Sequence, residues 1–155
     1  MKKSFFSLLV FLLAAHLVKA QGSDLIDIDC SKLINDYYLV IKAPDGSIAR
    51  AATNSISISD SHQFQVDIYK VKGIVPAEDK AAVMQSKTLQ FKQMELEDSK
   101  GFIYEAVAGK TSSSHFHFYA VFKTGTYLIT DHEGSSYPLE KIKIMYELLK
   151  LAEEK

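Results

Sequence analysis

The stretch at residues 114–133, SHFHFYAVFKTGTYLITDHE, constrains the fold more than any other part of the chain. Its two apolar halves meet at residues 123–126, a pattern that indicates two antiparallel strands joined by a tight turn. One face of these strands is apolar and is predicted to belong to the core; it carries Phe116, Phe118, Ala120, Phe122, Tyr127 and Ile129. Chemistry is expected on the other face, because this stretch holds three of the chain's five histidines.

The register of this strand pair decides whether its histidines meet. A two-residue turn at residues 124–125 would place His117 opposite His132, and His115 would lie beside His117 on the same face. Three neutral imidazoles suit zinc, copper or nickel. We therefore predict a candidate metal site of His115, His117 and His132, with zinc or copper as the possible cofactor. A bulged or three-residue turn would change the register, and the histidines would then be ordinary polar residues on the wetter face of a sheet.

Two further segments predict strands that have one apolar and one polar face. Residues 55–59 and 64–70 both alternate at period two, which favours an antiparallel sheet covered on one side. Residues 37–43 are rich in β-forming side chains and end at Pro44-Asp45-Gly46, a turn sequence. A hairpin is therefore expected, with residues 47–52 as its return strand.

A strand with an irregularity is predicted between residues 89 and 98. Its apolar positions change parity on the way, which predicts a β-bulge near Lys92 and Gln93. Residues 102–108 form the next strand, and the polar residues 109–113 are expected to link it to the histidine stretch as a hydroxyl-rich loop.

Two helices are predicted, each with a proline in its first turn. The first spans residues 76–87, and its apolar positions Ala77, Ala81 and Met84 are expected to pack close to the sheet without carrying a site. The second begins at Pro138, with Ser136 or Tyr137 as its cap. Its stripe is expected to cover the core, although it could also bind a partner, and consists of Leu139, Ile142, Met145, Leu148, Leu149 and Ala152.

The N-terminus has the pattern of a secretory signal peptide over residues 1–20. Two lysines, an apolar run at residues 5–15 and the small-residue site Val18-Lys19-Ala20 follow in the order that such leaders use. The apolar run is too short for a spanning helix, which needs about 20 apolar residues. The protein is therefore expected to be secreted or periplasmic, with no integral membrane segment after cleavage.

Charge and cysteine content narrow the possible partners. The chain has 18 Lys and Arg against 19 Asp and Glu, and loss of Lys2, Lys3 and Lys19 with the leader leaves a net charge of −4. A mildly acidic protein has no electrostatic reason to bind nucleic acid, so the expected partner is an unknown protein or small molecule. The single cysteine, Cys30, is expected to be a small buried hydrophobic residue.

The chain is expected to contain one folded domain. Residues 21–36 are predicted to form an N-terminal arm with a turn of helix near residues 31–35, and residues 37–155 a single domain. The expected fold class is α+β, an antiparallel sheet of about six to eight strands with two main helices packed on it.

This order of elements resembles the PsbP-like fold, an antiparallel α/β/α sandwich. The resemblance covers roughly residues 37–154 and rests on the strand FQVDIYK, the meander of QFKQMELE, GFIYEAVA, HFHFYAVF and TYLITDHE, and the closing PLEKIKIMYELLKLAEE. Members of that fold mostly act as adaptors or assembly factors, and some are exported bacterial proteins of unassigned activity, so the resemblance implies a binding or accessory role. It is a likeness of element order, and no functional residue is carried over. A cystatin-like or other helix-on-sheet fold is the structural alternative.

The sequence contains no diagnostic catalytic motif. GxGxxG, P-loop, HExxH and CxxC patterns are all missing. Ser114 with His115 or His117 is a conceivable acyl-transfer arrangement, but no nucleophile elbow surrounds it. We therefore predict an exported noncatalytic binding or accessory protein of the cell envelope, without catalytic residues. The alternative is a transition-metal-binding protein that uses the histidines of the C-terminal hairpin.

Overall fold

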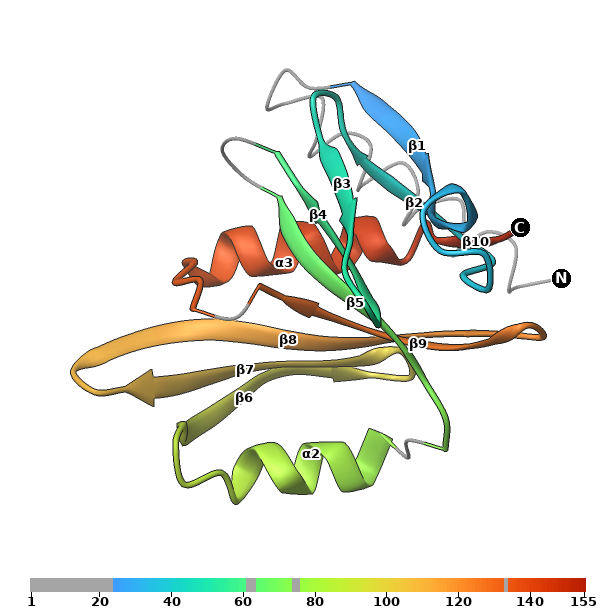
Figure 1. Cartoon of the computed structure of the whole chain (residues 1–155). Helices are drawn as coiled ribbons and strands as arrows, with labels where there is room; N and C mark the ends of the chain where they lie inside the picture. The colour runs from blue at the N-terminus through green and yellow to red at the C-terminus, as the bar shows by residue number, and fades with distance from the viewer. Residues whose placement is uncertain (1–23, 61–63, 74–75, 133) are drawn as a thin grey trace, which may run out of the picture.

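Two antiparallel sheets and two α-helices make up the described part of the computed structural model, which covers residues 24–60, 64–73, 76–132 and 134–155 (Figure 1). The predicted α+β fold is confirmed, and the predicted leader lies outside the described residues. The elements are β1 (Leu25–Asp29), the 3-10 helix η1 (Cys30–Lys32), β2 (Leu39–Pro44), β3 (Ile48–Ala51), β4 (Ser55–Ser59), β5 (Gln65–Val71), α2 (Pro76–Met84), β6 (Gln90–Asp98), β7 (Gly101–Ala108), β8 (Thr111–Phe122), β9 (Gly125–Asp131), α3 (Leu139–Leu149) and β10 (Glu153–Glu154).

The larger sheet has seven strands in the order β3-β4-β5-β9-β8-β7-β6. The two alternating segments predicted as strands are confirmed as β4 and β5, and the strands after α2 form the predicted meander. The predicted bulge is confirmed by the register shift between Phe91 and Gln93, and a second shift follows between Met94 and Leu96. Both lie in β6 at the edge of the sheet, where bulges discourage pairing with another chain.

The smaller sheet, in the order β1-β2-β10, shows that the predicted hairpin of β2 and β3 is wrong. The chain does turn after Pro44, since the Ser47 N–H donates to the Pro44 carbonyl over 3.1 Å and Gly46 has a φ of 85°. However, β2 pairs with β1 and β10, whereas β3 pairs with β4 in the larger sheet. Both edges of β2 are therefore occupied, and β3 becomes an edge strand of the other sheet.

The N-terminal arm is tied into this smaller sheet through β1. The turn of helix that follows, η1, begins at Cys30, slightly earlier than predicted. Cys30 is fully buried, as expected, and burial raises the pKa of its thiol to about 12. The thiol is therefore protonated and unreactive in the folded protein.

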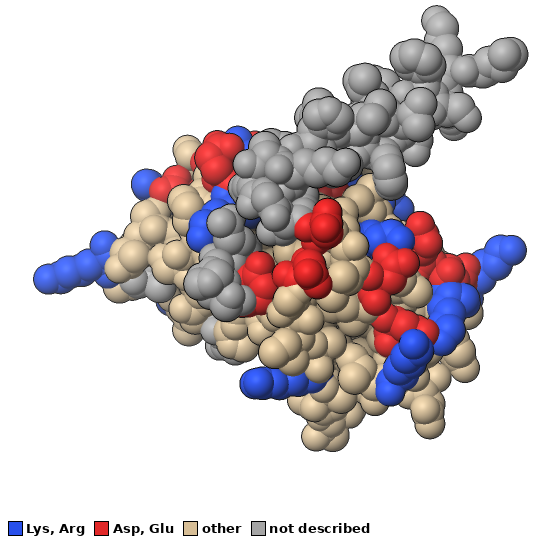
Figure 2. Space-filling view, turned by 90° about the horizontal axis from the view of Figure 1, so that it is seen from above, with Lys and Arg blue, Asp and Glu red and all other residues tan. Residues whose placement is uncertain are grey.

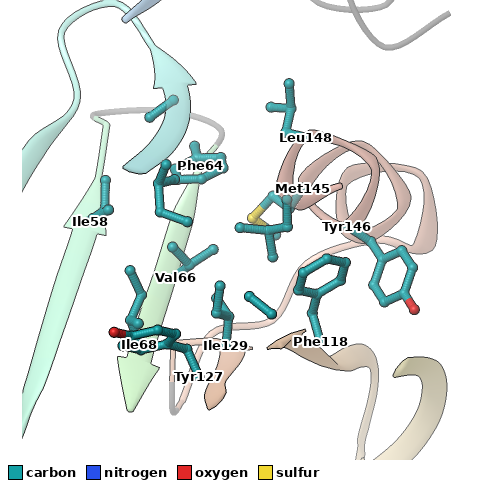
Figure 3. Close-up of a cluster of buried hydrophobic side chains, with 14 of the residues drawn as sticks. Ile58, Phe64, Val66, Ile68, Phe118, Tyr127, Ile129, Met145, Tyr146 and Leu148 are labelled. Atoms are coloured by element: carbon teal, nitrogen blue, oxygen red, sulfur yellow. The ribbon is translucent and has the colours of Figure 1, made fainter. Parts of the chain in front are cut away.

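Helix α3 covers one face of the larger sheet and closes the main core (Figure 3). The ring of Tyr146 lies edge-on to Phe116 and Phe118, with ring centres 6.0 and 5.3 Å away, a favourable aromatic geometry. The predicted stripe is confirmed at its centre, where the helix buries Ile142, Met145, Leu148 and Leu149 together with Tyr146.

The start of α3 differs from the prediction. Pro138 itself is the N-cap, and no side chain makes a capping hydrogen bond, so the expected cap at Ser136 or Tyr137 is wrong. The Tyr137 hydroxyl donates instead to Oε1 of Gln65 over 2.9 Å. Tyr137 thus fixes the approach of α3 to β5 rather than its first turn.

Helix α2 lies on the opposite face of the larger sheet from α3 (Figure 1). Its Val83 packs against a second, smaller cluster formed by Phe102, Tyr104, Ala106 and Tyr119. The expected packing of Ala77, Ala81 and Met84 is wrong, because α2 has no buried residue and these three side chains are exposed. One residue of α2, Asp79, reaches the sheet and contacts the side chains of His117 and Tyr119 on β8.

The helices and the charged side chains of the surface bear on the possible surroundings of the protein. In the described part of the chain, no helix combines the length and apolarity needed to cross a membrane. Basic and acidic side chains are interspersed on the face shown in Figure 2, in keeping with the nearly balanced composition.

Replacing Gly101 with alanine should strongly destabilise the protein. A Cβ atom at position 101 would lie 2.0 Å from the backbone oxygen of His117, so β7 would have to separate from β8. We expect the free energy of unfolding to fall by about 3 kcal/mol or more, measured by urea denaturation followed by circular dichroism.

Gly46→Ala is the matched control. Gly46 also has a positive φ, but no atom lies within 4 Å of an added Cβ, so only a conformational loss of about 1 kcal/mol is expected. Equal losses in the two variants would contradict the close approach of β7 to β8.

Candidate functional site

Strand β8 supplies most of the site because its side chains alternate between two faces. Phe116 and Phe118 point into the main core, whereas His115 and His117 lie on the opposite face of the sheet, here called the open face. The strand already begins at Thr111. The predicted loop at residues 109–113 is therefore wrong, and Ser113 joins the two histidines on the open face.

The turn between β8 and β9 lies one residue earlier than predicted. Phe122 pairs with Gly125, and His117 pairs with Thr130, so the predicted pairing of His117 with His132 is wrong. Moving a turn by one residue shifts the partner of every residue by two positions, and each side chain keeps its predicted face. His132 therefore remains on the side of His115 and His117, just beyond the end of β9.

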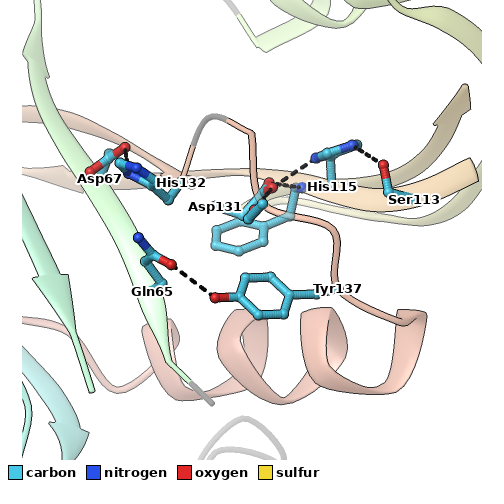
Figure 4. A network of polar contacts seen from close by, with 9 residues as sticks. Gln65, Asp67, Ser113, His115, Asp131, His132 and Tyr137 are labelled. Carbon is cyan, nitrogen blue, oxygen red and sulfur yellow. Dashed lines mark hydrogen bonds and ion pairs between the residues drawn. The ribbon is translucent and has the colours of Figure 1, made fainter. Parts of the chain in front are cut away.

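Each of the three histidines is paired with its own aspartate through Nδ1 (Figure 4 shows two of the pairs). The Nδ1–carboxylate distances are 2.7 Å for His115 and Asp131, 2.5 Å for His117 and Asp79, and 2.8 Å for His132 and Asp67. The aspartates come from β9, α2 and β5, which are separate in the sequence. A carboxylate on Nδ1 fixes the ring orientation and leaves Nε2 as the outward atom.

Asp131 is one of two nearly buried carboxylates in the site, with 7% of its surface exposed. It accepts hydrogen bonds from the Phe116 backbone N–H at 2.9 Å and the Ser135 hydroxyl at 3.1 Å, in addition to His115. A buried charge needs such donors to offset its lost hydration. His115 in turn makes a second contact, with Oγ of Ser113 lying 2.7 Å from its Nε2.

Asp67 is a buried carboxylate on the face of β5 that the sequence predicted to be polar. It is only 5% exposed, and it accepts hydrogen bonds from Ser57 at 2.5 Å and from His132. Ser57 lies directly across from it on β4, and Thr130 lies across on β9. The alternation of residues 64–70 is thus real, but the polar face is covered at this point.

Asp79 links helix α2 to the open face. Burial opposes its ionisation, but hydrogen bonds from His117 and Tyr119 outweigh burial and hold the pKa of Asp79 below its ordinary value. Burial and the bond to Asp79 raise the pKa of the Tyr119 hydroxyl, which remains a proton donor. Helix α2 therefore contributes the carboxylate that orients His117, which its sequence pattern did not indicate.

Aromatic rings hold the histidines from the side. The ring of Phe102 is stacked on His117 with centres 5.1 Å apart. The centre of the Tyr104 ring lies 5.6 Å from the ring centre of His115 and 5.8 Å from that of His117. Hydrogen bonds and ring packing together leave these imidazoles little freedom.

The three histidines line one cavity of about 670 Å³, here called the histidine pocket. Leu89 and Tyr104 supply apolar wall, and residues 134–136 also line it. Among the described residues that line it, none is Lys or Arg. Within the described chain, Nε2 of His117 and of His132 has no hydrogen-bond partner, and both residues line the pocket.

The structure brings His115, His117 and His132 to one pocket but not to one ligand set. No group of three or more His, Cys, Asp or Glu in the described residues is arranged to hold a metal ion. Nε2 of His115 is also engaged by Ser113. The metal site therefore stays a prediction.

Sequence reasoning did not identify Asp67, Asp79, Ser113 or Asp131 as members of the site. Asp67 and Asp79 are far in sequence from the histidines that they contact. Ser113 lies in a segment that was predicted to be a loop. The alternating pattern of residues 64–70 was the one signal that could have placed Asp67 on the open face.

Comparison with known proteins does not extend this description, because no family model, no curated protein and no solved structure matches the chain.

Replacing Asp79 with asparagine should reduce stability in a pH-dependent way. Because its pKa is lowered on folding, ionised Asp79 stabilises the folded state above its ordinary pKa of 3.8, and this contribution is lost as the pH falls through the lower folded value. We expect a loss of about 1–2 kcal/mol at neutral pH, with wild type and variant converging below about pH 4. Urea denaturation across this pH range measures the difference.

Glu78→Gln is the control, because Glu78 precedes Asp79 on the same helix and is exposed. Its effect should stay within about 0.5 kcal/mol at every pH. An Asp79→Asn loss that does not change with pH would contradict the assigned role of the ionised carboxylate.

Proposed function

We propose that this protein is an exported binding or accessory protein of the cell envelope that holds a small ligand in the histidine pocket. The observation that carries this proposal is the pair of outward Nε2 atoms, on His117 and His132, in one cavity. Each ring is held at Nδ1 by a carboxylate, so neither needs to reorganise on binding. A largely apolar cavity with a few fixed polar groups is the usual form of a small-molecule site.

Charge limits the class of ligand. The pocket has three carboxylates directly behind its imidazoles, and no Lys or Arg among its described lining residues. An anionic ligand would meet no fixed cation and three nearby negative charges. Neutral Nε2 atoms accept hydrogen bonds. A neutral or cationic molecule with hydroxyl or amine donors and an apolar side therefore fits best.

Two sequence features support export and a binding role. The N-terminal pattern of residues 1–20 is that of a cleaved leader, which supports a secreted or periplasmic location. The resemblance of the element order to the PsbP-like fold points to adaptor or accessory proteins, although fold likeness is a weak guide to function.

A screen by NMR of the histidine ring signals tests the proposed ligand class. Small polyols and amines should shift the signals of His115, His117 and His132, while carboxylates and phosphates of similar size should bind at least about tenfold more weakly, a difference of 1.4 kcal/mol. His117→Ala should remove the response.

Ser112→Ala serves as the matched control, because Ser112 is exposed and its hydroxyl donates to Glu105 rather than lining the pocket. A screen in which anions bind best, or in which no compound moves these signals, would refute the proposed ligand class.

Transition-metal binding is the second candidate function. A carboxylate on Nδ1 is what metal-binding histidines commonly have, because it fixes the ring and makes Nε2 a better ligand. Against it, the described residues provide no common ligand set. This candidate therefore requires the imidazoles to move toward one another when the ion binds.

Calorimetric titration with zinc tests the second candidate. It predicts one bound ion per chain, with binding lost in the double variant His117→Ala and His132→Ala and kept in Ser112→Ala. Binding that is unchanged in the double variant would rule out this pocket as the metal site.

A further inference from the structure

Ser113, His115 and Asp131 form a continuous hydrogen-bonded chain on the wall of the histidine pocket. Oγ of Ser113 lies 2.7 Å from Nε2 of His115, and Nδ1 of His115 lies 2.7 Å from Oδ2 of Asp131 (Figure 4). Acyl-transfer catalysis needs this connectivity: a nucleophile, a base bonded to it, and a third group that orients the base. The arrangement is recognised by geometry and not by sequence order.

The fold holds this chain of contacts rigidly. Ser113 and His115 are two residues apart on β8, so they share a face. Asp131 is fixed by the Phe116 backbone and by Ser135, and the ring of Tyr104 packs beside His115. Because Asp131 accepts the proton on Nδ1, the neutral ring presents Nε2 as an acceptor toward the Ser113 hydroxyl.

The other two histidine–aspartate pairs make a useful comparison. His117 is held by Asp79 and His132 by Asp67, but neither has a hydroxyl on Nε2 in the described structure. Ser113 is therefore the one hydroxyl among the described residues that is placed to be activated by a paired imidazole. Ser114, the serine that the sequence suggested, is buried, and its backbone N–H contacts the Tyr137 carbonyl.

We infer that Ser113 is the nucleophile of a carboxylic-ester hydrolase activity in this pocket. Oγ of Ser113 attacks the ester carbonyl carbon, and its proton passes to Nε2 of His115. The bond to the leaving alcohol then breaks, and His115 returns the proton to the departing oxygen. Water attacks the acyl-serine with His115 again as base, which releases the acid and restores Ser113. Ser113 and His115 are catalytic residues, and Asp131 is a positioning residue.

The pocket also indicates the class of ester. Its volume of about 670 Å³ and its Leu89 and Tyr104 walls fit a small neutral ester. The absence of Lys and Arg from its described lining argues against esters that carry a carboxylate or phosphate group. This inference rests on the proposed ligand pocket and adds a chemical step to it.

The experiment combines covalent labelling with turnover of a model ester. The protein is incubated with phenylmethylsulfonyl fluoride, and the modified residue is identified by mass spectrometry. Hydrolysis of p-nitrophenyl acetate is then measured for the wild type, Ser113→Ala, Asp131→Asn and the control Ser112→Ala. Circular dichroism confirms that each variant is folded.

The expected result is a sulfonyl adduct on Ser113 and hydrolysis that falls at least about 100-fold in Ser113→Ala. Asp131→Asn should lower kcat with little change in KM, because Asp131 acts through His115 and does not touch the ester. Ser112→Ala should behave as the wild type. A purely structural hydrogen-bond chain would affect stability but would not produce an adduct.

Two results would overturn the inference: a wild-type protein that forms no adduct on Ser113, or hydrolysis that survives in Ser113→Ala. The first needs no variant, so it holds even if Ser113→Ala does not fold. Ligand binding seen by NMR without labelling or turnover would refute the hydrolase and leave the binding function in place.

Discussion

Strand β8 must satisfy two surfaces at once, and the rest of the structure depends on how it does so. Its aromatic face meets α3 through Phe116, Phe118 and Tyr146 and carries much of the main core. Its other face carries His115 and His117, which pair with Asp131 of β9 and Asp79 of α2. The same strand therefore anchors the core and builds the pocket.

Burying carboxylates on the open face would be unfavourable without donors. Each aspartate therefore has at least two partners: Ser57 and His132 for Asp67, His117 and Tyr119 for Asp79, and His115, Ser135 and a backbone N–H for Asp131. Networks of this kind stabilise one conformation when every member has a partner. The histidine rings are consequently fixed before any ligand arrives, which reduces the entropy lost on binding.

Local periodicity revealed much of the fold. It placed β4, β5, the meander, the β6 bulge and the stripe of α3, because in each case the residues that face the core repeat along one element. It failed where the partner lies far away in sequence. The hairpin of β2 was wrong because β1 and β10 compete for its edges. The stripe of α2 was wrong because Ala77, Ala81 and Met84 are exposed. Local periodicity also could not reveal the contact of Asp79 with His117, which joins residues 38 positions apart. Ser113 was missed because a run of serines suggests a loop as readily as a strand edge.

The central claim is that three histidines are held at Nδ1 by aspartates, so that Nε2 faces the histidine pocket. Nitrogen-15 NMR of the imidazole side chains, recorded at a pH where the rings are neutral, measures this directly. The structure predicts that His115, His117 and His132 carry their proton on Nδ1 and have an unprotonated Nε2. Finding the proton on Nε2 of these rings would contradict the pairing with Asp131, Asp79 and Asp67, and with it both the proposed ligand site and the role assigned to Ser113.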